Sequence, residues 1–192
     1  MKMLLGRDGI NPYESDDDGQ TPLYIAARYG HEAVVAMLLR RDDVDPNTPD
    51  DDGQTPLHCA AGNGHLGVVE MLLGRDDIDP NALDHDGQTP LHSAARNGDE
   101  GVVEILLAQD DIYPDKPDKV GQTPLCCAAR HWNARAVNVL LGRNGPNKPG
   151  NQGQTALLPA IEAGYKGMLG YSSYGTKSTP TRQMTRATHH SC

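Results

Sequence analysis

The sequence predicts an all-α solenoid built from stacked helical repeats. The string GQTPL begins at Gly19, Gly53, Gly87 and Gly121, with a weaker GQTAL at Gly153, so that its threonines are 34, 34, 34 and 32 residues apart. Each string is followed by apolar residues at helical spacing. Self-similarity at a fixed period of this length is typical of repeat architectures. We therefore expect an array of small units rather than one compact domain.

Each unit begins with a turn and a short helix. In DDDGQTPLHCAAGNGH the acids can hydrogen-bond their own backbone, and Gly53 suits a tight turn. Thr55 suits the N-cap of a helix and Pro56 its first position. Gly64 can end that helix in the left-handed conformation. A helix of about eight residues is too short to persist alone in water.

A second helix and a return loop complete the unit. Val68, Val69, Leu72 and Leu73 fall on one face of this helix. The loop GRDDIDPN then leads to the next turn, and the residue before its proline is held extended. Neither helix can bury its apolar face alone, so stacking on neighbouring units must supply the core.

The repeat pattern divides the chain into seven parts. MLLGRDGINPY near the N-terminus matches the later MLLGRDDIDPN, which favours a fragment of a longer array or a shortened gene model. Pro159 interrupts the fifth unit, and the residues after 171 have almost no apolar side chains, which predicts disorder. The expected parts are the truncated tail of a preceding repeat (1–15), full repeats (16–49, 50–83, 84–117), a divergent repeat (118–149), a degenerate terminal repeat (150–171) and a disordered tail (172–192).

Composition excludes several classes of function. The chain has 17 basic and 26 acidic residues and a net charge of −9, which disfavours nucleic acid and anionic membranes as main partners. No apolar run approaches the roughly 18 residues of a membrane helix. The four cysteines are irregularly placed and do not form a disulfide framework. We expect a monomer in a reducing compartment, the cytoplasm or alternatively the nucleus.

The repeated motif resembles the ankyrin repeat. DxDGQTPLHxAAxxGHxxVVxxLL matches that family's consensus at nearly every defining position, over roughly residues 3–170. The loop RDDxDPN resembles loops in ankyrin arrays of filamentous fungi. The resemblance implies a concave binding face and a structural role for the histidine of TPLH, whose imidazole would link neighbouring loops.

A metal site was the alternative interpretation of residues 50–65, which hold three acids, two histidines and a cysteine. The position of His58 is occupied by Tyr24, His92 and Cys126 in the other units. A metal site needs a fixed set of ligands, and this position does not keep one. No catalytic motif such as G-x-S-x-G, H-E-x-x-H or a Walker loop occurs. We therefore predict no metal, no cofactor and no enzymatic activity.

The predicted function is the binding of a protein partner on the concave face. The resemblance implies contacts from turn tips and from the exposed ends of the inner helices, while the recurring glutamines of GQTPL look like part of the scaffold. The contact residues expected are Asp17, Asp18, Arg28, Tyr29, Asp51, Asp52, Asn63, His85, Asp86, Arg96, Asn97, Lys119, Val120, Arg130, His131 and Trp132. The alternative is a sensor, spacer or autoinhibitory arm of a larger signalling protein, with its effector domain elsewhere.

Trp132 interrupts the pattern of the fourth unit. It occupies the position of Gly30, Gly64 and Gly98, where the chain should turn through the left-handed region. Two interpretations are open: Trp132 fills a local gap in a divergent unit, or it is an exposed contact anchor. Asn133 is an alternative carrier of the left-handed turn, since asparagine tolerates that conformation better than tryptophan.

Overall fold

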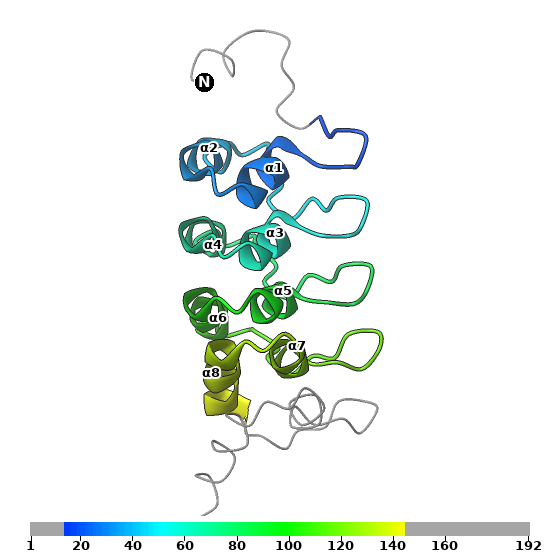
Figure 1. Cartoon of the computed structure of the whole chain (residues 1–192). Coiled ribbons are helices and arrows are strands. Elements are labelled where there is room, and N and C mark those ends of the chain that lie inside the picture. Colours follow the sequence, from blue (N-terminus) through cyan, green and yellow to red (C-terminus); the bar gives the residue numbers. More distant parts are fainter. Residues whose placement is uncertain (1–13, 145–192) are drawn as a thin grey trace, which may run out of the picture.

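The computed structural model describes residues 14–144 and confirms an all-α solenoid, with eight helices and no strand in that range. Figure 1 shows the helices paired and stacked, with one loop per pair projecting to the same side. The expectations for the degenerate repeat and the disordered tail lie outside the described residues, as does most of the first part. The helices are α1 (Pro22–Arg28), α2 (Glu32–Leu38), α3 (Pro56–Gly62), α4 (Leu66–Leu73), α5 (Pro90–Asn97), α6 (Glu100–Leu107), α7 (Pro124–Arg130) and α8 (Ala134–Asn144).

The inner helices α1, α3, α5 and α7 begin as the sequence predicts. Each follows an extended threonine at the N-cap and has proline in its first turn. In α1, for example, the Thr21 hydroxyl accepts a hydrogen bond from the Tyr24 N–H at 3.2 Å. This bond satisfies one of the amide groups that a helix leaves without a partner at its start. The four inner helices have seven or eight residues each, so their persistence depends on packing against neighbours.

His58 connects its own unit to the next one. Its Nδ1 lies 3.2 Å from the Thr55 backbone nitrogen, and its Nε2 lies 3.0 Å from the carbonyl oxygen of Gln88. Because the Thr55 amide is a donor, Nδ1 accepts and the ring proton is on Nε2, which donates to Gln88. His92 repeats this arrangement with Thr89, at 3.0 Å, and with the carbonyl of Gln122, at 3.1 Å. The expectation that the histidine of TPLH links neighbouring loops is therefore confirmed.

One continuous apolar core runs through the stack. Inner helices pack on inner helices and outer helices on outer helices, while each pair also packs on itself. Paired alanines in the inner helices let the neighbouring backbones approach closely, and leucine and valine fill the space toward the outer helices. The fully buried members include Ala27, Ala60, Ala61, Ala94, Ala95, Ala128, Ala129, Leu57, Leu91, Val35, Val69, Val103, Leu72, Leu106 and Leu140.

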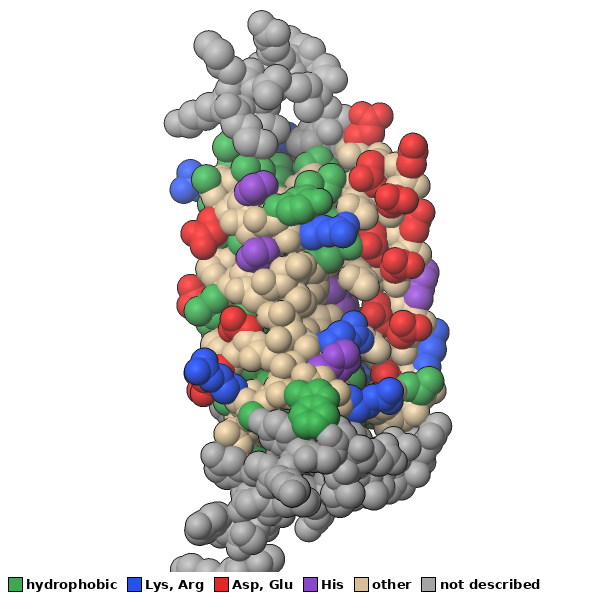
Figure 2. All heavy atoms as spheres, viewed as in Figure 1, with side chains coloured by type: hydrophobic (Ala, Val, Ile, Leu, Met, Phe, Trp, Pro, Cys, Tyr) green, Lys and Arg blue, Asp and Glu red, His purple; other side chains and the backbone are tan. Residues whose placement is uncertain are grey.

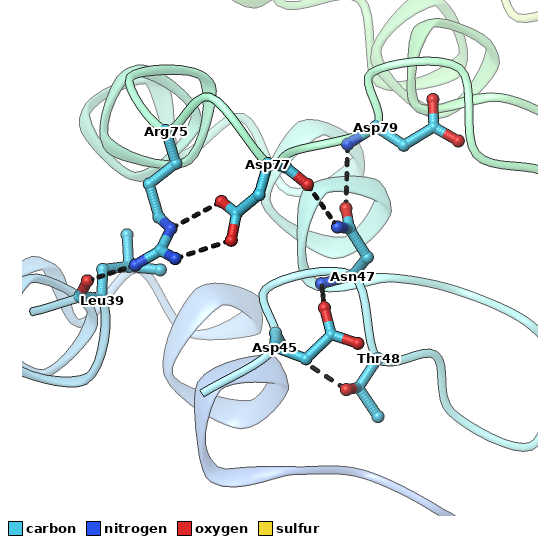
Figure 3. A network of polar contacts seen from close by, with 7 residues as sticks. All are labelled: Leu39, Asp45, Asn47, Thr48, Arg75, Asp77 and Asp79. Carbon is cyan, nitrogen blue, oxygen red and sulfur yellow. Dashed lines mark hydrogen bonds and ion pairs between the residues drawn. The ribbon is translucent and has the colours of Figure 1, made fainter. Parts of the chain in front are cut away.

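The return loops are joined by side chains that reach the backbone of the next unit (Figure 3). The amide of Asn47 donates to the Asp77 carbonyl at 2.6 Å, and its oxygen accepts from the Asp79 N–H at 2.9 Å. In the opposite direction, Arg75 pairs with Asp77 and donates to the Leu39 carbonyl at 2.6 Å. The RDDxDPN signature is thus a structural element that ties one return loop to another.

We expect the two buried histidines to make the fold sensitive to acid. Burial lowers the pKa of His58 and of His92, because the charged imidazolium is poorly solvated there. The unfolded chain, with an ordinary histidine pKa of about 6.5, binds more protons below that pH than the folded chain does. The free energy of unfolding should therefore be constant near neutrality and fall as the pH drops below about 6.5.

Urea denaturation at a series of pH values checks this prediction. A variant with both His58→Gln and His92→Gln should be less stable at neutral pH and should lose much of the dependence between about pH 7 and pH 5. An unfolding midpoint that does not change over this interval in the unmodified chain would contradict the prediction.

Replacing Asn81 should weaken the junction between the second and third units. Its amide donates to the Asp111 carbonyl at 2.9 Å, and its oxygen accepts from the Tyr113 N–H at 2.9 Å. Asn81→Ala removes both bonds, and we expect a loss of about 1–2 kcal/mol in the free energy of unfolding. Asn138→Ala, at an exposed site on α8, is the matched control and should not destabilise the chain. Equal urea midpoints for the two variants would show that the Asn81 bonds contribute nothing.

Candidate functional site

The loop of each unit is held by a single aspartate, which leaves the next two residues at the tip. The Asp50 carboxylate accepts from the Asp52 N–H at 3.0 Å and from the Gln54 N–H at 2.8 Å. Asp16, Asp84 and Asp118 make the same pair of contacts in their own loops. Since this aspartate is required by the turn, the residues that follow it are the ones free to vary.

Neighbouring tips are connected through the backbone. The Asp51 N–H donates to the Asp18 carbonyl at 3.1 Å, and the Lys119 N–H donates to the Asp86 carbonyl at 2.9 Å. His85 makes the equivalent bond to the Asp52 carbonyl. The tips therefore form a ridge of fixed spacing, with side chains that project outward.

A groove of about 550 Å³ lies between this ridge and the ends of the inner helices of the first three units. Part of its lining consists of small residues, which leave room for a side chain of a partner: Cys59, Gly62 and Ser93. The other lining residues are polar or charged and are Gln20, Tyr24, Arg28, Asp50, Asp52, Gln54, His58, Asn63, Arg96 and Asn97.

All sixteen residues expected to contact a partner are exposed. Five of them meet in the groove: Arg28, Asp52, Asn63, Arg96 and Asn97. The remaining ones lie outside the groove, on the tips, at the end of α1 or at the end of α7. Those not among the groove residues are Asp17, Asp18, Tyr29, Asp51, His85, Asp86, Lys119, Val120, Arg130, His131 and Trp132.

The glutamines of GQTPL are more than scaffold, and in this respect the sequence interpretation was incomplete. The backbone carbonyls of Gln88 and Gln122 do receive the histidine bonds, but the side-chain oxygens accept hydrogen bonds from Arg96 and Arg130. The spacing of eight residues between each glutamine and its arginine is visible in the sequence. Only the turn before the inner helix brings the two side chains together, so spacing alone did not predict the contact.

Tyr24 is a second lining residue that the sequence analysis did not assign to the site. Its hydroxyl donates to the Asp50 carboxylate at 2.5 Å, which joins the first unit to the second. Burial raises the pKa of the Tyr24 hydroxyl, and the hydrogen bond to Asp50 raises it further. The hydroxyl therefore remains protonated near neutral pH and acts as a donor within the groove wall.

Charge is unevenly distributed along this face. Acidic side chains gather over the loops on the right of Figure 2, and most of the lysine and arginine side chains lie lower on the same view. Among the expected contact residues, the first two units carry Asp17, Asp18, Asp51 and Asp52 against Arg28. The third and fourth units carry Arg96, Lys119 and Arg130 against Asp86. The face is thus acidic at one end and basic at the other.

The titratable groups in and beside the groove are engaged in structural contacts. Both ring nitrogens of His58 are hydrogen-bonded, so neither can bind a metal without breaking the link between units. Burial raises the pKa of the Cys59 and Cys127 thiols to about 11, which keeps them in the unreactive protonated form. Within residues 14–144, no group of three or more His, Cys, Asp or Glu side chains is arranged to hold a metal ion. Over the same residues, no helix is long and apolar enough to cross a membrane.

Comparison with protein families accounts for this architecture. A family model described as ankyrin repeats (3 copies) matches residues 1–84, 43–118 and 77–152. The chain belongs to the ankyrin repeat family. Ankyrin repeats generally mediate interactions between proteins and are typically non-enzymatic. A comparison of the sequence with curated proteins found no match.

Trp132 departs from the ankyrin pattern without changing the backbone. Its φ is 62°, close to the 68° of Gly30, and the equivalent Gly98 also lies in the left-handed region. The turn is therefore at Trp132 and not at Asn133, whose side chain instead donates to the Ala95 and Arg96 carbonyls at 3.0 and 2.6 Å. The Asn133 side chain is thereby committed to the end of α5. The indole is 49% exposed.

Replacing Trp132 by glycine in the ankyrin array should preserve or increase stability. The left-handed conformation costs a residue with a side chain roughly 1 kcal/mol, and Trp132→Gly removes this cost. We expect the free energy of unfolding to rise by up to about 1 kcal/mol in urea denaturation followed by circular dichroism. Trp132→Ala retains the strained Cβ and is the control that should show no gain. A clear loss with Trp132→Gly would identify the indole as a packing residue instead.

Proposed function

We propose that this chain is a protein-binding module that holds a protein partner on the concave face of its ankyrin stack, without catalysing a reaction. The observation that carries the proposal is the groove between the tip ridge and the inner helices, where Arg28, Asp52, Asn63, Arg96 and Asn97 meet over small side chains. An open polar groove with mixed charge suits a segment of protein better than a buried apolar ligand.

In each unit, the residues that hold the fold are separate from the exposed residues that a partner can contact, and this separation supports the proposed function. The groups that hold the fold bond backbone atoms: Asp50 bonds the amides of its own loop, and His58 bonds the Gln88 carbonyl of the next unit. The neighbouring tip and helix-end side chains are exposed and differ between units. A surface with a regular backbone and varied side chains can select one partner, because specificity is the difference between its affinities for that partner and for others.

We further propose that the module acts as a monomer in the cytoplasm, with the nucleus as the alternative. The cysteines among the described residues, Cys59, Cys126 and Cys127, are free and buried, which fits a reducing compartment.

Affinity capture with groove variants tests the concave face as the binding surface. Asn63→Tyr and Asn97→Tyr place a bulky side chain in the groove at exposed positions and should leave the fold intact. Asn138→Tyr introduces the same side chain on the outer helix α8. We expect proteins captured by the unmodified chain, identified by mass spectrometry, to be reduced at least about tenfold with either groove variant and to be retained with Asn138→Tyr.

The opposite pattern would contradict the proposal. If the outer-helix variant lost the same proteins, or if both groove variants retained them, binding would depend on another surface. Thermal unfolding of each variant separates a loss of binding from a loss of fold.

A further inference from the structure

Two arginines on neighbouring inner helices are held in the same way. Arg96 donates to the side-chain oxygen of Gln88, and Arg130 Nη1 donates to that of Gln122 at 3.0 Å. Both arginines are exposed. A guanidinium has five N–H donors in a planar fork, and each glutamine occupies only part of it. The two groups are therefore oriented in advance and still have donors for a ligand.

Neither arginine forms an ion pair with a carboxylate of the described residues, unlike Arg41 with Asp43 and Arg75 with Asp77 on the return loops. The carboxylate of the buried Asp118 accepts from the Gln88 amide at 3.4 Å, on the side chain whose oxygen holds Arg96. Burial lowers the pKa of His131, and the positive charges of Arg96 and Arg130 lower it further. Lys119, at the tip of the fourth unit, adds a third positive charge, and its ammonium group also donates to the His85 carbonyl at 2.5 Å.

The acidic tips of the first two units limit which ligands can bind to the third and fourth units. The tips of the first two units carry Asp17, Asp18, Asp51 and Asp52, all exposed. A nucleic acid lying along the face would bring phosphates against these carboxylates, which repel them. A short segment that carries its negative charge locally can use the two arginines and avoid the acidic tips.

Trp132 adds an apolar contact to the basic end. Its indole is 49% exposed and directly follows His131 in the chain. Its left-handed backbone is a strained conformation for a tryptophan, of the kind found more often at binding sites than elsewhere. Tryptophan and arginine together are the residues most enriched where binding energy concentrates.

We propose that the third and fourth units bind a short acidic segment of the protein partner, with its carboxylates on Arg96 and Arg130 and an apolar residue against Trp132. This inference rests on the proposed function and specifies which partner segment the concave face accepts. Packed helices lie about 8–10 Å apart. In a polyproline II segment, residues three apart lie on the same side and about 9 Å apart, so acidic side chains at this spacing reach both arginines. Carboxylates suit the site because a guanidinium binds them through two parallel hydrogen bonds.

The sole tryptophan provides a direct test in the full chain. The probe is a synthetic peptide of about six residues with glutamates at three-residue spacing and a leucine at one end. We expect a saturable change in Trp132 emission, and in the anisotropy of a fluorescein-labelled copy. Arg96→Gln and Arg130→Gln should each weaken binding at least about tenfold, because each removes charge-assisted hydrogen bonds.

Arg40→Gln is the matched control. Arg40 is exposed, follows the outer helix α2 of the first unit and is not among the groove residues. The variant makes the same change in net charge, so it should leave affinity for the acidic peptide within about twofold. A peptide with glutamine in place of glutamate, and an oligothymidylate of similar length, should bind much more weakly.

Three outcomes would overturn the inference: no saturation up to about 1 mM peptide, an equal loss with Arg40→Gln, or equal affinity for the oligothymidylate. These failures differ from failure of the proposed function. If the tyrosine groove variants abolish partner capture while Arg96→Gln and Arg130→Gln do not, the concave face is the binding surface and the acidic segment is wrong. If the tyrosine groove variants leave capture intact, the concave-face function itself is wrong.

Discussion

The fold depends on backbone groups that one unit leaves open and an adjacent unit satisfies. The Gln88 carbonyl receives the ring proton of His58, and the Asp77 carbonyl receives the amide protons of Asn47. At the end of α5, Asn133 donates to the Ala95 and Arg96 carbonyls. Each donor is a short side chain with a fixed reach, so consecutive units must keep their spacing and orientation. A unit removed from the stack would lose these bonds together with the apolar faces of its helices.

This dependence on neighbours separates the structural from the variable positions of each unit. The side chains that bond along the stack are buried or partly buried. Each position must supply a particular hydrogen-bond donor or acceptor, which restricts the residues that can occupy it. At the position of His58, the first and fourth units have other residues and other bonds. Tyr24 donates to the Asp50 carboxylate of the next unit, and Cys126 accepts from the Thr123 hydroxyl of its own unit. Among the described residues, most side chains at the tips and the exposed helix ends make no bond along the stack, with Lys119 and its bond to the His85 carbonyl as an exception. They can therefore differ in charge from unit to unit without weakening the array.

The fourth unit shows how a regular scaffold can carry a chemically distinct site. It has lysine and valine at the tip instead of two acids, and tryptophan at a position that otherwise holds glycine. These changes fall on exposed positions and leave the backbone path intact, including the left-handed turn. Together with the arginines held by Gln88 and Gln122, they give this end of the face a sign of charge opposite to that of the first two units.

The sequence by itself determined the all-α class, because this follows from a strict period and from local rules for turns and helix ends. The resemblance of its repeated motif to the ankyrin repeat gave the family and the role of the TPLH histidine. The sequence also located the left-handed position at Trp132, although it left Asn133 as an alternative. It did not predict that Gln88 and Gln122 orient arginines, that Tyr24 reaches Asp50, or that Asn47 binds the next return loop. Those contacts join residues brought together by the turns or by the stacking of units. Only the tertiary structure decides them, because side-chain direction and the distance between units are not encoded in the spacing of any one motif.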